Sequence, residues 1–326
     1  MIRCKVQRAK QEDTGWAVFF TAMLFLILWT APAGAHIADG ENMLTDWHWR
    51  WDVIFVLSIF AILYIHGWRR LRKIGGEAKL SQLVFYAIAL IAIGAALLSP
   101  LDDLASYLLI AHMLQHELLI MLAPPLILLA NPVPVLLWGL GESPRLQAAH
   151  LLARHSAIRR VRDILGSMPV AWSLYVINLW AWHYPALYDA ALRVPWIHDL
   201  EHVLFFLTAL VFWWPVIQPA SRLAPIQHGL RILYLFFAAT QDTILAGLIA
   251  LSREVLYPHY QTALRLWNMT PQEDQIGGGI VMFVVGSTTY AIAILILVNA
   301  LLGEGRRKRS TKRTLSDGAE KVEGRI

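Results

Sequence analysis

Two pairs of histidines at helical spacing are the residues of this sequence best suited to metal chemistry. His112 and His116 lie four residues apart in an apolar stretch, and His198 and His202 repeat that spacing. On an α-helix, side chains at positions i and i+4 project from the same face. Each pair therefore offers two imidazole nitrogens, which are common metal ligands. We expect both pairs to contribute to one site.

Other side chains could complete such a site. His183 ends an apolar segment, Asp242 lies inside one, Asp274 precedes another, and Met113 follows His112. A carboxylate in hydrocarbon is costly, which favours a functional role for Asp242, and a thioether suits cuprous copper. Each also has a structural interpretation: a carbonyl-bonded histidine, a hydrogen-bonded acid or a packing methionine. We predict that the metal ligands are His112, His116, His183, His198 and His202, with Asp242, Asp274 and Met113 as additional candidates.

The donor types restrict the chemistry. The only cysteine is Cys4, in a segment that we expect to be removed, so thiolate metal sites and disulfides are not predicted. Histidine with methionine or carboxylate suits copper or zinc, and two histidines can also hold a haem. The run His112-Met-Leu-Gln-His116 has the spacing of the HExxH zinc motif but lacks its glutamate, which disfavours a zinc protease.

The composition predicts an all-α integral membrane protein. Of the 326 residues, 57% are hydrophobic and only 16% are charged, against about 25% charged in soluble domains. Residues 1–35 combine a basic start, an apolar core and Ala33-Gly34-Ala35, which is typical of a cleaved signal peptide. An uncleaved signal anchor is the alternative.

Seven further apolar segments follow, so we expect a bundle of seven transmembrane helices over residues 36–302. They lie near residues 52–68, 82–98, 107–129, 169–182, 202–217, 230–251 and 277–302. Prolines at 124, 125, 132 and 134 predict that the third helix is broken rather than straight. Residues 303–326 are charged and non-periodic, which indicates a basic, disordered tail.

The basic residues predict the orientation. Of the 28 lysines and arginines, 24 fall on the side of the first loop and the tail. By the positive-inside rule, the mature N-terminus is outside and the C-terminus is cytoplasmic in a multi-pass plasma (inner) membrane protein. The two histidine pairs and His183 then share the outer side. Because the net charge of +5 follows this topology, it does not indicate a nucleic-acid partner.

Several motifs in a fixed order resemble the polytopic CtaG family, assembly factors of caa3-type cytochrome c oxidases. They are His112-Met-Leu-Gln-His116 with Ala123-Pro124-Pro125, Trp182-His183-Tyr-Pro185, His198-Asp-Leu-Glu201-His202 with Phe212-Trp213-Trp214-Pro215, Leu256-Tyr257-Pro258, and Asp274-Gln275-Ile-Gly277-Gly278. The resemblance covers roughly residues 50–300. One departure is Met282-Phe283, where the family often has Met-Trp.

The resemblance implies a copper chaperone rather than an enzyme, one that helps to form the oxidase copper centre. It implies oxidase subunits and the lipid bilayer as partners and leaves a homo-oligomer open. Two other functions remain compatible with the residues alone: a haem-binding membrane electron carrier, and a proton or metal transporter that uses Asp242 and the histidines.

Overall fold

A computed structural model describes residues 49–76, 78–147, 156–217 and 226–323, and all the regular structure in these ranges is helical. The segment predicted to be a signal peptide or anchor lies outside them. Six described helices are long and apolar enough to cross a membrane, as expected of a multi-pass membrane protein. They comprise α2 (Trp51–Lys73), α3 (Leu80–Leu98), the combined helix Leu109–Ala130, α12 (Pro195–Ile217), α13 (His228–Leu251) and the Pro271–Glu304 part of α15 (Pro271–Glu323).

The expected count of seven spans is therefore not reached among the described residues. The fourth expected span is α10 (Met168–Trp182), which has only 15 residues. At about 1.5 Å per residue it is about 22 Å long, shorter than a hydrocarbon core of about 30 Å. It ends where Tyr184 and Pro185 turn the chain into α11 (Pro185–Arg193).

The third span is broken, as the prolines predicted. It comprises α5 (Leu109–Glu117), a π-helical turn η1 (Leu118–Leu122) and α6 (Ala123–Ala130). Pro124 has no N–H to donate to the carbonyl of Ile120 four residues earlier. The indole Nε1 of Trp213 donates to that carbonyl instead, at 3.2 Å. The break is thus stabilised by a side chain of α12.

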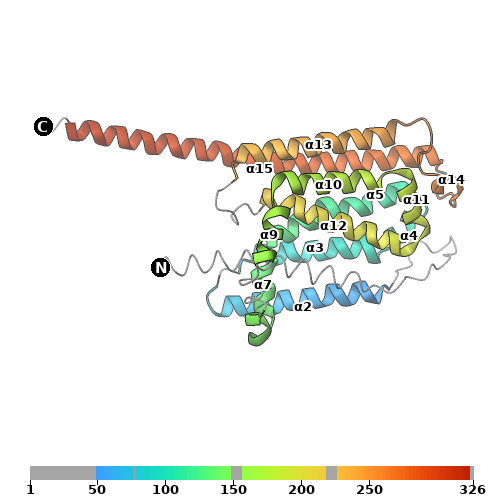
Figure 1. The fold of residues 1–326 in the computed structure, drawn as a ribbon, viewed down its shortest axis with the longest axis horizontal. Helices are drawn as coiled ribbons and strands as arrows, with labels where there is room; N and C mark the ends of the chain where they lie inside the picture. The colour runs from blue at the N-terminus through green and yellow to red at the C-terminus, as the bar shows by residue number, and fades with distance from the viewer. Residues whose placement is uncertain (1–48, 77, 148–155, 218–225, 324–326) are drawn as a thin grey trace.

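Asn131, with φ of 46°, ends this helix and redirects the chain into α7 (Pro132–Gly139). Figure 1 shows α7 crossing α2 at a steep angle. Glycines make the crossing close: a Cβ atom on Gly67 would lie 1.8 Å from the carbonyl oxygen of Val135, and one on Gly139 would lie 2.1 Å from that of Leu63. Small residues allow this approach of helices in membranes.

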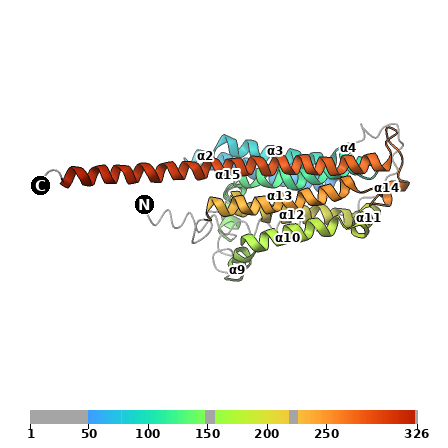
Figure 2. The same ribbon diagram turned by 90° about the horizontal axis from the view of Figure 1, so that it is seen from above.

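Helices α13 and α15 lie side by side, as Figures 1 and 2 both show. The glycine run 277–279 faces two neighbours, since Cβ atoms would meet Ile110 of α5 at Gly277 and the carbonyl oxygen of Ala246 at Gly279. The run therefore lets α15 pack closely against both α5 and α13.

Short helices in the described ranges include α4 (Pro100–Ala105), α9 (Ser156–Leu165) and α14 (His259–Thr262). Helix α4 begins at a proline and is capped by Ser99, whose Oγ accepts from the Leu101 N–H at 3.2 Å. In Figure 1, α4, α11 and α14 lie at the end of the bundle opposite to the extension of α15.

The extension of α15 to Glu323 differs from the disordered tail expected for residues 303–326. A helix that is already formed can add residues without a new nucleation step, and arginine, lysine, glutamate and alanine all have high helix propensity.

Candidate metal centre

A buried carboxylate sets the start of α5 and so fixes the first histidine pair. The two oxygens of Asp274 accept from the backbone N–H groups of Leu109 at 2.7 Å and Ile110 at 3.0 Å. These N–H groups lie in the first helical turn, where no carbonyl of the same helix can reach them. Asp274 is thus placed as a cap that positions α5, and both its oxygens are engaged in that role.

His112 and His116 follow on one face of α5, with ring centroids 4.3 Å apart. On α12 the second pair repeats this arrangement, and the rings of His198 and His202 lie 4.1 Å apart. Helix α12 starts at Pro195, earlier than the expected span from residue 202, because proline is favoured in the first helical turn. His198 therefore lies inside the helix, one turn before His202.

The two pairs meet across the helix interface. The Nε2 atoms of His112 and His198 are 3.3 Å apart, and the ring centroids of His116 and His202 are 5.4 Å apart. His112, His116 and His202 are buried, and His198 is partly buried. Four imidazoles thus form one cluster inside the bundle, although the two pairs are far apart in the sequence.

Glu201 joins the four histidines, although it was not predicted as a ligand. Its carboxylate is fully buried, with Oε2 3.6 Å from His112 Nε2 and Oε1 3.7 Å from His116 Nε2. One signal was available: Glu201 follows His198 by three residues, which places both on one side of a helix.

Most polar atoms of this cluster lack the hydrogen bonds that buried polar groups normally make. Within the described part of the chain, neither ring nitrogen of His116 or His202 and neither carboxylate oxygen of Glu201 has a hydrogen-bond partner. Each such unsatisfied group costs about 1–3 kcal/mol. A bound cation would satisfy one nitrogen of a coordinating histidine and one oxygen of Glu201, and so remove part of that cost.

The geometry also fits a metal ion. One donor atom from each of His112, His198, Glu201 and His202 can be chosen so that all four lie within 4.8 Å of one another. Metal–ligand bonds of about 2.0–2.2 Å in a tetrahedron place neighbouring donors about 3.3–3.6 Å apart. The His112–His198 and His112–Glu201 separations already have these values, so a small contraction would complete a four-donor site.

Two tyrosines orient His112 from the opposite side of its ring. Its Nδ1 lies 2.8 Å from the hydroxyl of Tyr188 and 3.2 Å from that of Tyr260. Burial raises the pKa of both hydroxyls well above the ordinary value, so they remain protonated. Tyr260 donates its proton to the carbonyl of Ala105, which leaves its oxygen free to accept from His112 Nδ1–H. In that tautomer, Nε2 keeps its lone pair for a metal.

His183 lies at the margin of the cluster. Its Nδ1 is 2.8 Å from the carbonyl oxygen of Leu179, so Nδ1 carries the proton and Nε2 has the free lone pair. This Nε2 is buried without a hydrogen-bond partner in the described ranges, and the ring centroid is 6.2 Å from that of His116. His183 has the form of a ligand but is farther away than the other histidines.

Two of the additional candidates lie elsewhere. Met113 packs in the apolar core, about 100° around α5 from His112. Asp242 is buried in α13 and interacts electrostatically with Glu117 and with the hydroxyls of Tyr175 and Tyr290, which are 3.0 Å apart. It thus belongs to a second polar group in the core.

Comparison with known proteins agrees with the motif order. The family model of the cytochrome c oxidase caa3 assembly factor (Caa3_CtaG) matches residues 62–303. The chain belongs to the Caa3_CtaG family. All candidate ligands of this Caa3_CtaG protein lie within the matched range.

Relatives of this Caa3_CtaG chain occur in mycobacteria. An uncharacterized protein of Mycobacterium leprae is 24% identical over 293 residues, which cover 86% of the chain and 43% of the relative. Uncharacterized proteins of Mycobacterium bovis and Mycobacterium tuberculosis are each 25% identical over 273 residues, or 80% of the chain and 40% of the relative. The chain thus spans less than half the length of these relatives. No solved structure matches it significantly.

Proposed function

We propose that this protein binds copper at the four histidines and Glu201 and supports formation of the copper centre of a cytochrome c oxidase. The family supports a role in oxidase assembly. The observation that carries the copper proposal is the convergence of unpaired nitrogen and oxygen atoms from α5 and α12 inside an apolar bundle.

Neutral imidazoles and one carboxylate suit copper or zinc, and cupric ion binds a given donor set more tightly than zinc. A site without thiolates is compatible with a carrier, since a carrier must also release its ion. Glu201 supplies a negative charge that offsets the cost of bringing a cation into the apolar interior. The hydroxyl oxygen of Tyr260 can accept from His112 Nδ1–H, and in that tautomer Nε2 can coordinate.

We further propose that the site opens toward the outer side of the plasma membrane, with the C-terminus in the cytoplasm. The basic residues at the other end of the bundle, Arg69, Arg70, Arg72 and Lys73 among them, support this orientation. Helix α10 would be the seventh span, with the bilayer thinned around it. Oxidase subunits would then receive copper on the outer side, and no catalytic step is required of this chain.

A haem is less compatible with the same site. A porphyrin would have to lie between the two coordinating imidazoles, whereas His112 and His198 are in direct contact across the interface. The close packing favours a bare ion.

Metal analysis of the purified full-length protein, together with its visible spectrum, tests the proposal. We expect copper to bind in a fixed ratio to protein and no Soret band to appear. His202→Leu should lose the copper, whereas His66→Leu, an exposed site on α2, should retain it. A Soret band, or equal copper in both variants, would contradict the proposal.

A further inference from the structure

One carboxylate at the α4 end of the bundle lies close to the metal centre. Asp102 belongs to α4, which packs against α5, and its side chain is partly exposed. It interacts electrostatically with His112 and His198 of the cluster. Within the described ranges, no lysine or arginine forms an ion pair with it. Asp102 is thus an anionic group that contacts water and is near the buried histidines.

The side chain of Gln115 fixes the position of this carboxylate. Its Nε2 donates to Oδ1 of Asp102 at 2.6 Å and to the carbonyl of Ala96 on α3 at 2.8 Å. Gln115 follows His112 by three residues on α5, so the two lie on one side of that helix. Its Oε1 is buried and has no hydrogen-bond partner in the described part of the chain. The amide therefore holds Asp102 against α5 and keeps an unused oxygen on the side of the first histidine pair.

Helix α4 is also linked to the cluster where it ends. Tyr260 donates to the carbonyl of Ala105 at 2.8 Å, and the same hydroxyl lies 3.2 Å from Nδ1 of His112. The carbonyl oxygen of Ser106, the next residue, lies 2.9 Å from Nε2 of His259. These contacts hold α4 over the start of α5, so the folded protein keeps Asp102 close to the cluster.

The exposure of the histidines indicates access from the same end. Among the four histidines of the cluster, only His198 is partly exposed, and the other three are buried. Its Nε2 lies 3.3 Å from that of His112. An ion that binds to His198 is therefore already next to a fully buried donor.

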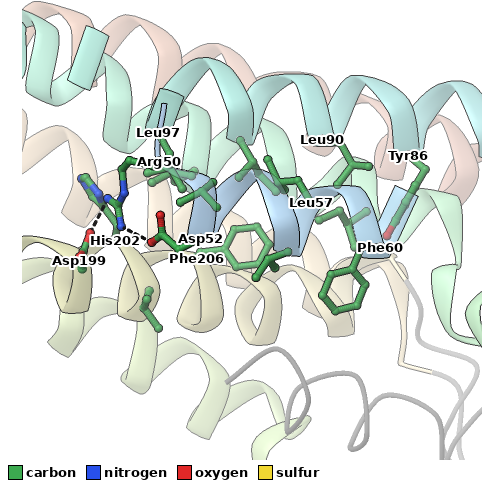
Figure 3. Close-up of a pocket in the computed structure, with 16 residues that line it drawn as sticks. Arg50, Asp52, Leu57, Phe60, Tyr86, Leu90, Leu97, Asp199, His202 and Phe206 are labelled. Atoms are coloured by element: carbon green, nitrogen blue, oxygen red, sulfur yellow. Dashed lines mark hydrogen bonds and ion pairs between the residues drawn. The ribbon is translucent and has the colours of Figure 1, made fainter. Parts of the chain in front are cut away.

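The side of the cluster that faces α2 is less suited to an entering cation. Figure 3 shows Arg50 and Asp199 next to His202. Arg50 donates to Asp199 at 2.6 Å and to Asp52 at 3.1 Å, so both carboxylates already pair with a cation. Beyond them, the side chains between α2 and α3 are mainly apolar and cannot replace the hydration of an ion.

We infer that Asp102 is the entry ligand of the metal centre: a copper ion binds first to Asp102 and then passes to His198 and His112. This inference rests on the proposed copper function. A cation that enters an apolar bundle loses hydration, and a carboxylate at the entrance compensates for part of that loss. Asp102 then affects mainly the rate of transfer, because the bound ion lies deeper, at the histidines and Glu201.

Stopped-flow mixing of the metal-free, full-length protein in detergent with cupric ion measures this rate, with quenching of tryptophan fluorescence as the signal. Excess chelator gives the rate of release. Asp102→Asn keeps an oxygen that can accept from Gln115 but removes the charge. Since entry and release pass through the same intermediate, both rate constants should fall at least about tenfold, while the dissociation constant stays within about threefold.

Two further variants separate this role from others. Asp102→Glu keeps the charge but displaces the oxygen from Gln115, so it should load within about threefold of the unmodified rate. Glu254→Gln removes a charge from an exposed residue in the loop after α13, at the same end of the bundle, and should load at the unmodified rate. Thermal unfolding without metal verifies that each variant is folded.

Three results would overturn the inference: a normal loading rate in Asp102→Asn, an equally low rate in Asp102→Glu, or equal slowing in Glu254→Gln. The second would assign Asp102 a hydrogen-bonding role, and the third would reduce its effect to general charge at this end. All three require that the unmodified protein takes up copper. Absence of that uptake would instead contradict the proposed function, and the inference with it.

Discussion

The Nε2 atoms of His112 and His198 lie 3.3 Å apart, although 86 residues separate the two histidines in the sequence. Two neutral ring nitrogens at this distance cannot both present lone pairs without repulsion. Either a proton or a cation must lie between them. Oε2 of Glu201 lies 3.6 Å from His112 Nε2 and offers a further donor atom to a cation at this place.

Glu201→Gln should weaken copper binding more than it changes folding. The amide retains the size of the side chain but removes the negative charge, so we expect the copper association constant to fall at least about tenfold, or about 1.4 kcal/mol. Competition with a chromophoric chelator measures the change.

Glu254→Gln is the matched control for that experiment, because Glu254 is exposed in the loop after α13. It should leave copper affinity unchanged. An unchanged affinity in the Glu201 variant would remove this carboxylate from the site.

His116→Leu separates a metal-binding role from a packing role. Neither ring nitrogen of His116 has a hydrogen-bond partner in the described chain, so leucine should preserve or raise the stability of the metal-free protein. Copper occupancy should fall. Thermal unfolding in detergent without metal, followed by metal analysis, gives both values, and a marked loss of metal-free stability would assign His116 a structural role.

Gly286→Ala should disturb the second polar group in the core. The new Cβ would lie 2.4 Å from Oδ2 of Asp242, and such overpacking typically costs about 1–3 kcal/mol. We expect a lower unfolding temperature, largely restored by adding Asp242→Ser. Gly247→Ala is the control, since no atom lies within 4 Å of its added Cβ.

Asp242→Asn asks whether the charge of this carboxyl group matters. The amide keeps the size and hydrogen-bonding capacity of the side chain, so membrane abundance should be preserved. We expect slower oxidase maturation when copper is scarce, because an ionisable group within a membrane span usually has a function. Full maturation under copper limitation would leave Asp242 with a hydrogen-bonding role alone.

Reporter fusions test the orientation. A reporter after Leu302 should be cytoplasmic, and one inserted near Asn268 should be outside, because the basic residues gather at the opposite end from the histidines. The reverse pattern would place the metal centre on the cytoplasmic side and contradict delivery from outside.

The histidine pairs were predictable because their geometry is local: four residues along a helix always return a side chain to the same face. The broken third span followed from its prolines for the same reason. The role of Glu201 could not be predicted in this way, since it depends on how α5 and α12 cross. Asp274 was predicted as a candidate ligand, and only the packing of α15 against α5 reveals that its oxygens bind backbone N–H groups instead.

The number of spans and the conformation of the tail also depend on neighbouring segments of the chain. The apolar composition of residues 169–182 predicted a membrane segment. The turn at Tyr184 and Pro185, however, determines where α10 ends. The charged residues after Leu302 showed no apolar periodicity, yet they continue the helix that precedes them.

The contact between Asp274 and the start of α5 has a consequence for the order of events during synthesis. The ribosome makes α5 long before α15, since 165 residues separate Leu109 from Asp274. A nascent chain therefore carries His112 and His116 on a helix whose first turn is not yet capped. The cluster therefore reaches its final register only after α15 has inserted, and we expect any metal binding to follow completion of the chain.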